Sequence, residues 1–233
     1  MEVAAWHGWD MSPACARRLQ EEMAGRVSRE GGPAGARFVA GTDMSVSRAD
    51  GAGTAAVVVL SYPGLELVET QVVTGELGFP YVPGLLSFRE APLVIAACAR
   101  LEHQPDLVLV DGQGIAHPRR LGLASHLGLF LNVPTVGCAK SRLCGRHGAP
   151  GEEKGSYAEL LDGDEIIGAV LRTKDRVKPL YISIGHKTDL ASAIEWVTVC
   201  CRGYRLPEPT RLAHLAAGGN LKAAGVPARG AVY

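Results

Sequence analysis

The sequence predicts an α/β fold in which one mixed sheet carries helices on both faces. Three observations indicate it. Three strand-like segments follow one another closely in the first third of the chain. After them, apolar segments of strand length alternate with segments of helix length, the pattern of α/β domains. The 233 residues are 47% hydrophobic, which suffices for the core of one large domain, so we expect residues 1–233 to form a single domain.

The first elements are a helix and an antiparallel meander. Ser12-Pro13 is a helix start, with a capping hydroxyl before a proline, and predicts a helix to about residue 26. Strands are expected over 38–46, 54–61 and 65–74. Asp50-Gly51 and Pro63-Gly64 separate them, and connections this short join antiparallel neighbours.

The middle of the chain alternates between helix and strand. A proline- and glycine-containing loop over 79–86 leads into a helix that reaches about residue 102. Leu107 to Val110 is a short unbroken apolar run bounded by turn signals, which is typical of a buried parallel strand. A helix over 121–131 and a strand over 135–138 follow, and then a polar loop over 142–156.

The last third predicts a hairpin, a strand and two helices. The hairpin strands are 157–161 and 166–171, followed by a strand over 180–184. A helix over 189–202 has Thr188 as its expected cap and Gly203 as its stop, and a last helix runs from 207–209 to Gly218. We expect residues 220–233 to be a poorly ordered tail. A meander followed by helix, strand, helix and strand is the order of a ribonuclease H-like fold, in which the first strand neighbours the first strand after the helix at the sheet centre.

Composition excludes some classes of function. The net charge is zero and the pI is near 7, so no overall charge attracts nucleic acid, and such binding would depend on local patches. The six cysteines form no CxxC pair and several lie in apolar stretches, as free thiols of a reducing compartment do. Neither a signal peptide nor a membrane span is apparent, so a cytoplasmic location is expected.

Two aspartates follow from this topology as candidates for chemistry. Asp111 comes directly after the Leu107–Val110 run, at the edge where open α/β sheets place ligands. A buried carboxylate needs a partner, and a metal ion is one candidate, although a turn cap is an equal alternative. Asp43 lies on a predicted strand among small and apolar residues, where aspartate is disfavoured. The alternative is that its side chain is on the solvent face of the sheet. If the two strands are neighbours, both acids can share one metal ion.

Other polar residues allow both a structural and a functional interpretation. Glu90 completes a capping box with Ser87, which local sequence favours over a ligand, although Pro92 removes a donor from the first turns. His117 and His214 are candidates for the site, with a surface position as the alternative. Lys140 ends a strand, where a lysine is usually solvated.

Two further features suggest contact with nucleic acid. A local rim of positive charge can position a phosphate backbone, and its expected members are Arg119, Arg120, Lys140, Arg142, Arg146 and Lys154. The segment Pro80 to Gly84 places Tyr81 between two prolines that stiffen the backbone. The tyrosine either packs within a rigid crossover or acts as a wedge that enters a base stack.

Taken together, these stretches resemble the endonuclease V family, the deoxyinosine 3′-endonucleases. The matching pieces, in order along the chain, are GTDMS (41–45), PYVPGLLSFREAP (80–92), LVDGQGIAHPRRLGLASHLG (109–128), GCAKSRL (137–143), PLYISIGHKTDL (179–190) and PEPTRLAH (207–214). The resemblance implies a single nuclease domain for DNA repair. It also implies hydrolysis of the second phosphodiester bond 3′ to inosine, leaving 3′-hydroxyl and 5′-phosphate ends.

The resemblance also implies roles for individual residues. Asp43 and Asp111 match Mg²⁺ ligands, with Mn²⁺ as a substitute, and Glu90 matches a third acid, which overrides the preference for a cap. The remaining catalytic residues that it implies are His117, Lys140 and His214. The implied DNA wedge is Pro80, Tyr81, Val82 and Pro83, and the implied lesion pocket is Gly84, Leu86, Gly112, Leu143 and Ser183. Val82 and Cys138 depart mildly from the family pattern.

The implied partner is DNA that contains deaminated bases, with single-stranded DNA and RNA left open, and we expect a monomer that binds no membrane. Three alternatives remain. The chain could cleave RNA at inosine, or bind nucleic acid without catalysis on the same fold. It could also be a phosphotransferase of the actin-like superfold, although that fold normally needs two duplicated domains and no internal repeat is apparent.

Overall fold

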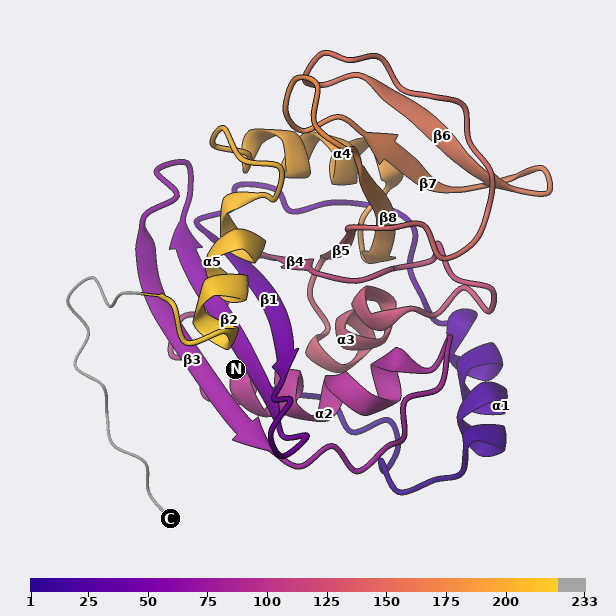
Figure 1. Cartoon of the computed structure of the whole chain (residues 1–233), viewed down its shortest axis with the longest axis vertical. Helices are drawn as coiled ribbons and strands as arrows, with labels where there is room; N and C mark the ends of the chain where they lie inside the picture. Colours follow the sequence, from indigo (N-terminus) through magenta and orange to yellow (C-terminus); the bar gives the residue numbers. More distant parts are fainter. Residues whose placement is uncertain (222–233) are drawn as a thin grey trace.

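The computed structural model describes residues 1–221 (Figure 1). The helices are α1 (Pro13–Ala24), α2 (Leu86–Ala99), α3 (Leu123–Leu131), α4 (Leu190–Val199) and α5 (Glu208–Ala217). The strands are β1 (Phe38–Val46), β2 (Gly53–Ser61), β3 (Leu67–Gly75), β4 (Leu107–Val110), β5 (Thr135–Ala139), β6 (Tyr157–Asp162), β7 (Glu165–Leu171) and β8 (Leu180–His186). The predicted elements are therefore present in the predicted order. The predicted tail lies outside the described residues, apart from 220 and 221.

One mixed sheet of eight strands forms the centre of the described chain, in the order β3-β2-β1-β4-β5-β8-β7-β6. β1 to β3 are an antiparallel meander, as predicted, and β1 pairs with β4 in parallel. β4 pairs with β5 in parallel, whereas β8 returns antiparallel to β5. The expected neighbours at the sheet centre, the first strand and the strand after the helix, are thus confirmed, and the fold is ribonuclease H-like.

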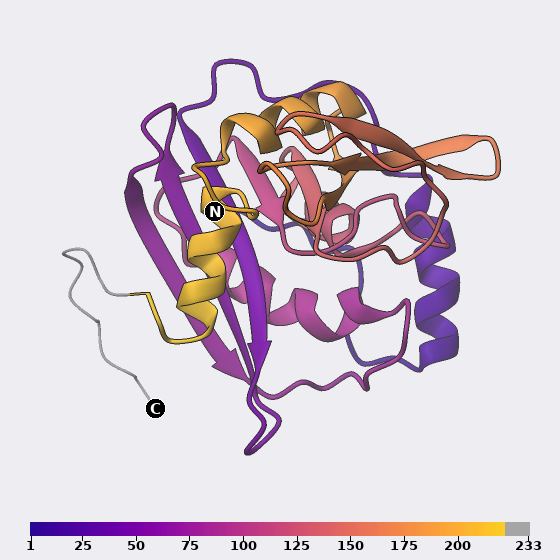
Figure 2. The same ribbon diagram turned by 45° about the horizontal axis from the view of Figure 1, so that its top comes forward.

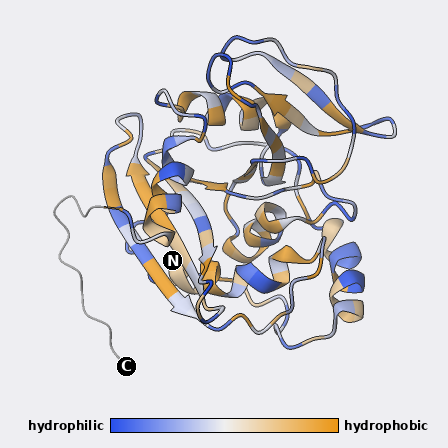
Figure 3. Cartoon of the chain, in the orientation of Figure 1, coloured by the Kyte–Doolittle hydropathy of each residue, from blue (hydrophilic) through white to orange (hydrophobic). Residues whose placement is uncertain are grey.

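Helices cover both faces of the sheet because the central strands are apolar on both sides. Val39 packs with the side chains of α4 and α5, whereas the next residue, Ala40, packs with those of α2 and α3. Successive side chains of a strand point to opposite faces, which explains the division. Figures 1 and 2 show α5 lying along β1 and β2 on one face, with α2 and α3 on the other. Colouring by hydropathy shows the same apolar strands and the more polar α1 at the periphery (Figure 3).

Gly41 permits the close approach of α5 to β1. A Cβ atom at this position would lie 2.1 Å from the backbone carbon of Pro209, in the first turn of α5. No side chain larger than hydrogen fits there. Asp43 lies two residues further along the same strand and therefore on the same face as Gly41, toward α5. The glycine thus brings the last helix within reach of the Asp43 carboxylate.

The structure corrects two predicted helix caps. The capping box of Ser87 and Glu90 is absent, because α2 begins at Leu86 and Leu85, at its N-cap, makes no side-chain cap hydrogen bond. Ser87 is buried in the first turn of α2, and Pro92 lies within the helix. For α4, the cap is Asp189, whose Oδ1 accepts from the Ser192 N–H over 2.7 Å, and not Thr188. This helix ends at Val199, earlier than the predicted stop at Gly203.

α1 lies beside the sheet and packs against the segment that precedes α2. Its buried Ala16 clusters with Phe79, Leu85 and Phe88. Phe79 and Leu85 flank the predicted wedge on its two sides, so α1 supports both ends of that segment. No helix within residues 1–221 is long and apolar enough to cross a membrane.

Candidate active site

The ends of β1 and β4 bring two aspartates together. The parallel register ends with Thr42 opposite Val110, and the Asp111 N–H continues the ladder by donating to the Thr42 carbonyl oxygen over 3.1 Å. Asp43 and Asp111, the next residues of the two strands, are therefore neighbours. Each side chain is only 10% exposed. Two carboxylates in a partly desolvated place repel each other and need cations nearby.

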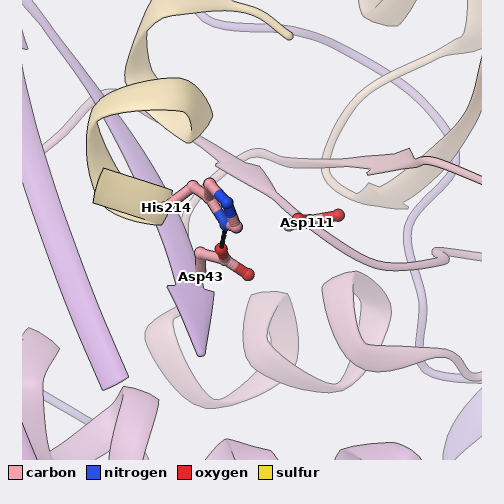
Figure 4. A group of neighbouring side chains, drawn as sticks. All are labelled: Asp43, Asp111 and His214. Atoms are coloured by element: carbon pink, nitrogen blue, oxygen red, sulfur yellow. Dashed lines mark hydrogen bonds and ion pairs between the residues drawn. The ribbon is translucent and has the colours of Figure 1, made fainter. Parts of the chain in front are cut away.

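A histidine from α5 completes this group (Figure 4). His214 Nδ1 lies 2.6 Å from Asp43 Oδ2, and because a carboxylate only accepts, the ring N–H donates. One ligand atom from each of Asp43, Asp111 and His214 lies within 4.8 Å of the others, a spacing that allows all three to hold one metal ion. The donor set is two carboxylates and one imidazole, and its oxygen atoms suit a hard cation such as Mg²⁺.

Lys140 provides the positive charge beside Asp111. Its ammonium group donates to Asp111 Oδ2 from the end of β5. The backbone of Lys140 is itself held, because the Arg205 guanidinium donates to the Lys140 carbonyl oxygen over 2.7 Å and to the Pro179 carbonyl oxygen over 2.8 Å. Lys140 is therefore placed by its strand and by Arg205, and does not extend freely into solvent.

Glu90 faces the two aspartates from α2. Burial, together with the charges of Asp43 and Asp111, raises the pKa of Glu90 to about 8. Burial and Asp43 raise the pKa of Asp111 to about 6, against the opposing effect of Lys140. Three carboxylates with too few positive charges are typical of a site that binds a cation. Glu90 is thus a third acid near the two aspartates, although it is not part of the group formed by Asp43, Asp111 and His214.

A cavity of about 390 Å³ opens beside this carboxylate cluster. Asp111 and Lys140 belong to its wall, so the cavity and the cluster are continuous. Most of the predicted wedge and pocket residues also line it, namely Tyr81, Val82, Pro83, Gly84, Leu86, Gly112 and Leu143. Tyr81 projects from this wall, since it is 71% exposed. The structure therefore brings together, at one opening, seven of the nine residues that the resemblance assigned to wedge and pocket.

Two predicted residues, Pro80 and Ser183, do not line the cavity, and a third, His117, lines it without a free ring nitrogen. Pro80 precedes the cavity wall without being part of it. Ser183 is fully buried behind the wall, where its hydroxyl accepts from the Gly114 N–H over 2.8 Å. His117 lines the cavity with both ring nitrogens bonded: Nε2–H donates to the Gly84 carbonyl oxygen over 3.0 Å, and Nδ1 accepts from the Arg119 N–H. Burial lowers the pKa of His117 to about 4, so the ring is neutral at pH 7.

Only some residues of the predicted basic rim lie where they could contact a phosphate backbone beside the cavity. Arg120 is paired with Asp162 and Glu165 of the hairpin. Lys140 and Arg142, by contrast, both line the cavity. The positive charge that lines the cavity therefore lies on the segment that follows β5, where Lys140 is paired with Asp111.

Two polar residues of the cavity wall that were not predicted as site residues carry buried atoms without a partner in the described chain. Ser87 Oγ and Gln113 Oε1 are buried, and within residues 1–221 neither has a hydrogen-bond partner. The Gln113 amide nitrogen donates to the Ser141 carbonyl oxygen over 2.8 Å, so its orientation is fixed. Buried polar atoms without partners are uncommon and indicate a missing ligand or water. The position of Gln113 between two glycines after a strand was the only signal in the sequence that could have identified it.

Comparison with known proteins agrees with this geometry. The family model of endonuclease V matches residues 21–215. An endonuclease V of Dehalococcoides mccartyi is 55% identical over 217 residues, which are 93% of this chain and 97% of that protein. An endonuclease V of Gloeobacter violaceus is 54% identical over 213 residues, 90% of this chain and 87% of that protein.

Solved structures extend the agreement to three dimensions. The endonuclease V of Streptomyces avermitilis is 41% identical, with a TM-score of 0.86, and covers 94% of this chain and 96% of its own. The protein of Bacillus subtilis has a TM-score of 0.89 at 33% identity, with the same coverage. The endonuclease V of Ciona intestinalis, 28% identical with a TM-score of 0.74 over 91% of this chain and 98% of its own, was crystallised with DNA containing an inosine followed by a ribo-adenosine.

Proposed function

The chain belongs to the endonuclease V family, and we propose on this premise that it cleaves DNA beside deaminated bases, chiefly inosine. The bond hydrolysed is the second phosphodiester bond 3′ to the lesion, and the products carry 3′-hydroxyl and 5′-phosphate ends. The observation that carries the proposal is the continuity between the Asp43–Asp111 cluster and the cavity behind Tyr81. A flipped base and the phosphate that follows it need two such compartments side by side.

Mg²⁺ is the proposed cofactor, with Mn²⁺ as a substitute. Asp43 and Asp111 would hold it, because Mg²⁺ binds through one or two carboxylates and phosphate oxygens. When bound, the ion polarises the scissile phosphate and stabilises the charge of the leaving 3′-oxygen. A second observation supports the fit: burial and the repulsion between the carboxylates raise the pKa values of Glu90 and Asp111, and a bound cation would stabilise their charged forms.

Each remaining side chain has a role near the phosphate. The Lys140 ammonium offsets negative charge that develops on the phosphoryl oxygens. His214 donates its Nδ1–H to Asp43, so in the neutral ring Nε2 is the free acceptor and can orient the attacking water. Glu90, with a pKa of about 8, is largely protonated until further positive charge arrives, which makes it a weaker candidate for that role.

Base selection follows from the cavity. A mispaired inosine costs less to unstack than a paired base, which is one source of selectivity. Tyr81 is exposed at the mouth and would fill the gap that the extruded base leaves in the stack. Ser87 Oγ and Gln113 Oε1 offer unpaired hydrogen-bonding atoms in the wall of the cavity that would receive the base.

The test is a comparison of matched strands with Mg²⁺: DNA with inosine, the same DNA with adenosine, and RNA with inosine. We expect cleavage of the inosine DNA at one position and no cleavage of the adenosine strand. Faster cleavage of the RNA would replace the proposed substrate by RNA. Tight binding of all strands without any product would instead indicate a non-catalytic nucleic-acid-binding protein.

A further inference from the structure

The carbonyl oxygen of Gly84 accepts hydrogen bonds from three side chains at once. The donors are Gln20 Nε2 at 3.1 Å, His117 Nε2 at 3.0 Å and Arg119 Nη2 at 2.8 Å. Gly84 itself has φ +78°, a conformation that other residues avoid. A Cβ atom there would also lie 2.9 Å from Arg119 Nη2. Both the backbone conformation and the surrounding side chains are thus arranged for this one carbonyl group.

Gln20 connects this carbonyl group to the remainder of the site. Its amide nitrogen also donates to the Leu121 carbonyl oxygen over 2.9 Å, and its Oε1 accepts from Arg119 Nε over 2.6 Å. Gln20 is only 1% exposed on α1, so a polar side chain is buried there with both its oxygen and its nitrogen paired. A buried polar group that is fully paired fixes the relative positions of the segments that it joins. Here the segments are α1, the residue after Pro83, and the chain from His117 to Leu121.

The guanidinium group of Arg119 donates from two nitrogens to two acceptors, which a lysine ammonium group has no matching geometry for. Nε binds Gln20 while Nη2 binds Gly84, and the backbone N–H of Arg119 donates to His117 Nδ1 over 3.1 Å. The last bond leaves the proton of the neutral His117 ring on Nε2, where it donates to the same carbonyl oxygen. The three side chains therefore form one connected network around Gly84.

We propose that Gln20 and Arg119 are positioning residues for lesion recognition, which hold the Gly84 carbonyl group together with His117 and so fix the wedge segment, residues 80–83. The inference rests on the proposed function and adds to it a role for α1, whose Ala16 also packs with Phe79 and Leu85 at the two ends of the wedge. Tyr81 is 71% exposed and receives little support from its own packing. A wedge that is ordered before binding saves the entropy of ordering it on the DNA. The order of Tyr81 would therefore come from the residues that surround its segment.

Two substitutions test the network. Gln20→Met keeps the length of the side chain and removes all three of its hydrogen bonds. Arg119→Lys keeps the charge but cannot bind Gln20 and Gly84 at the same time. Glu22→Gln and Arg18→Lys, both at exposed positions of α1, are the matched controls. Arg119 is partly exposed, so its variant remains informative if burial makes Gln20→Met unstable.

Three quantities are measured for each variant: the ratio of affinities for inosine DNA and the matched adenosine DNA, the fluorescence of 2-aminopurine placed next to inosine, and kcat at saturating substrate. We expect the affinity ratio to fall roughly tenfold, as for loss of one or two hydrogen bonds. The fluorescence increase that reports unstacking should shrink, while kcat stays within about twofold, because the carboxylate cluster is untouched. The controls should match wild type.

Other results would overturn the proposal. An unchanged affinity ratio and fluorescence in folded Arg119→Lys and Gln20→Met would show that the network plays no part in recognition. Equal weakening on both DNAs, or a loss confined to kcat, would assign these residues to general stability or to catalysis. Failure of the proposed function is recognised separately, because wild-type protein would then neither prefer nor cleave inosine DNA.

Discussion

The backbone N–H of Asp111 donates to the carbonyl oxygen of Thr42 over 3.1 Å, and this bond sets the distance between the two central carboxylates. It extends the parallel ladder of β1 and β4 by one residue beyond the last paired residues, Thr42 and Val110. The backbone of each aspartate is therefore anchored to the sheet, while His214 and Lys140 bind the two carboxylates. A site on rigid elements keeps its geometry when substrate binds.

Asp111→Ala should abolish cleavage and leave much of the binding to inosine DNA. The carboxylate is a proposed metal ligand, whereas the cavity wall around Gly112 stays intact. We expect cleavage to fall by more than roughly a hundredfold, measured in single turnover with Mg²⁺. Asp164→Ala, an exposed acid of the hairpin, is the control. A normal rate of the Asp111 variant would remove Asp111 from the metal site.

Mg²⁺ and Mn²⁺ should each raise the melting temperature in the absence of DNA. A ligand that binds only the folded state stabilises it by about 2.7 kcal/mol at a hundredfold excess over its Kd. Asp43→Asn should lose this increase, because it removes one charge from the cluster that would hold the ion. The measurement is thermal unfolding with increasing metal ion. An equal increase in the variant would place the metal elsewhere.

Stability without metal should fall as pH rises through neutrality. The pKa of Glu90 is about 8 in the folded state and 4.5 ordinarily, so between these values the folded protein binds more protons than the unfolded chain. The contribution of Glu90 to the free energy of unfolding therefore decreases with rising pH, by roughly 1.5 kcal/mol between about pH 6.5 and about pH 8.

The buried histidines His117, His126 and His186, whose pKa values burial lowers, oppose this fall up to about pH 7.5, because their unfolded forms still lose protons there; above that pH they are neutral in both states. Glu90→Gln should accordingly flatten the pH dependence and raise the melting temperature near pH 8. Denaturation by urea at several pH values, in a chelating buffer, provides the test. An equally steep pH dependence in the variant would show that Glu90 is not the group responsible.

Tyr81→Ala should weaken binding to inosine DNA more than binding to undamaged DNA. An aromatic ring stacked on a base contributes about 1–3 kcal/mol, so roughly a tenfold or greater loss is expected on the inosine strand. Stability should hardly change, since Tyr81 is 71% exposed. Tyr204→Ala, another exposed tyrosine, serves as control. Equal loss on both DNAs would reduce Tyr81 to a general DNA contact.

The sequence predicted the fold, because the order of strand-like and helix-like segments is a pattern along the chain. The pairing of the two aspartates followed only if the first strand and the strand after the helix were neighbours. The run Leu107–Val110 is typical of a buried strand, and the meander before it indicated the strand order that the structure has. Helix caps were less predictable. Ser87 has the residue type of a cap, but tertiary packing buries it inside α2 and begins the helix earlier.

Residues that act through backbone groups of distant segments were beyond sequence reasoning. Gln20 lies on a polar helix, and nothing local distinguishes it from the residues around it. Its partners are the carbonyl oxygens of Gly84 and Leu121, and a backbone carbonyl gives no signal in the sequence. Ser183 shows the reverse, because resemblance assigned it to the pocket and the fold places it behind the wall.

As proposed, this carboxylate cluster hydrolyses one bond at a fixed distance from inosine. The most direct test is to map the cleavage of an end-labelled DNA strand with a single inosine, incubated with Mg²⁺. We expect one product that ends with a 3′-hydroxyl one nucleotide beyond the inosine, and no product from the adenosine strand or from Asp111→Ala. Cleavage at other positions, equal cleavage of the adenosine strand, or no cleavage at all would contradict the claim.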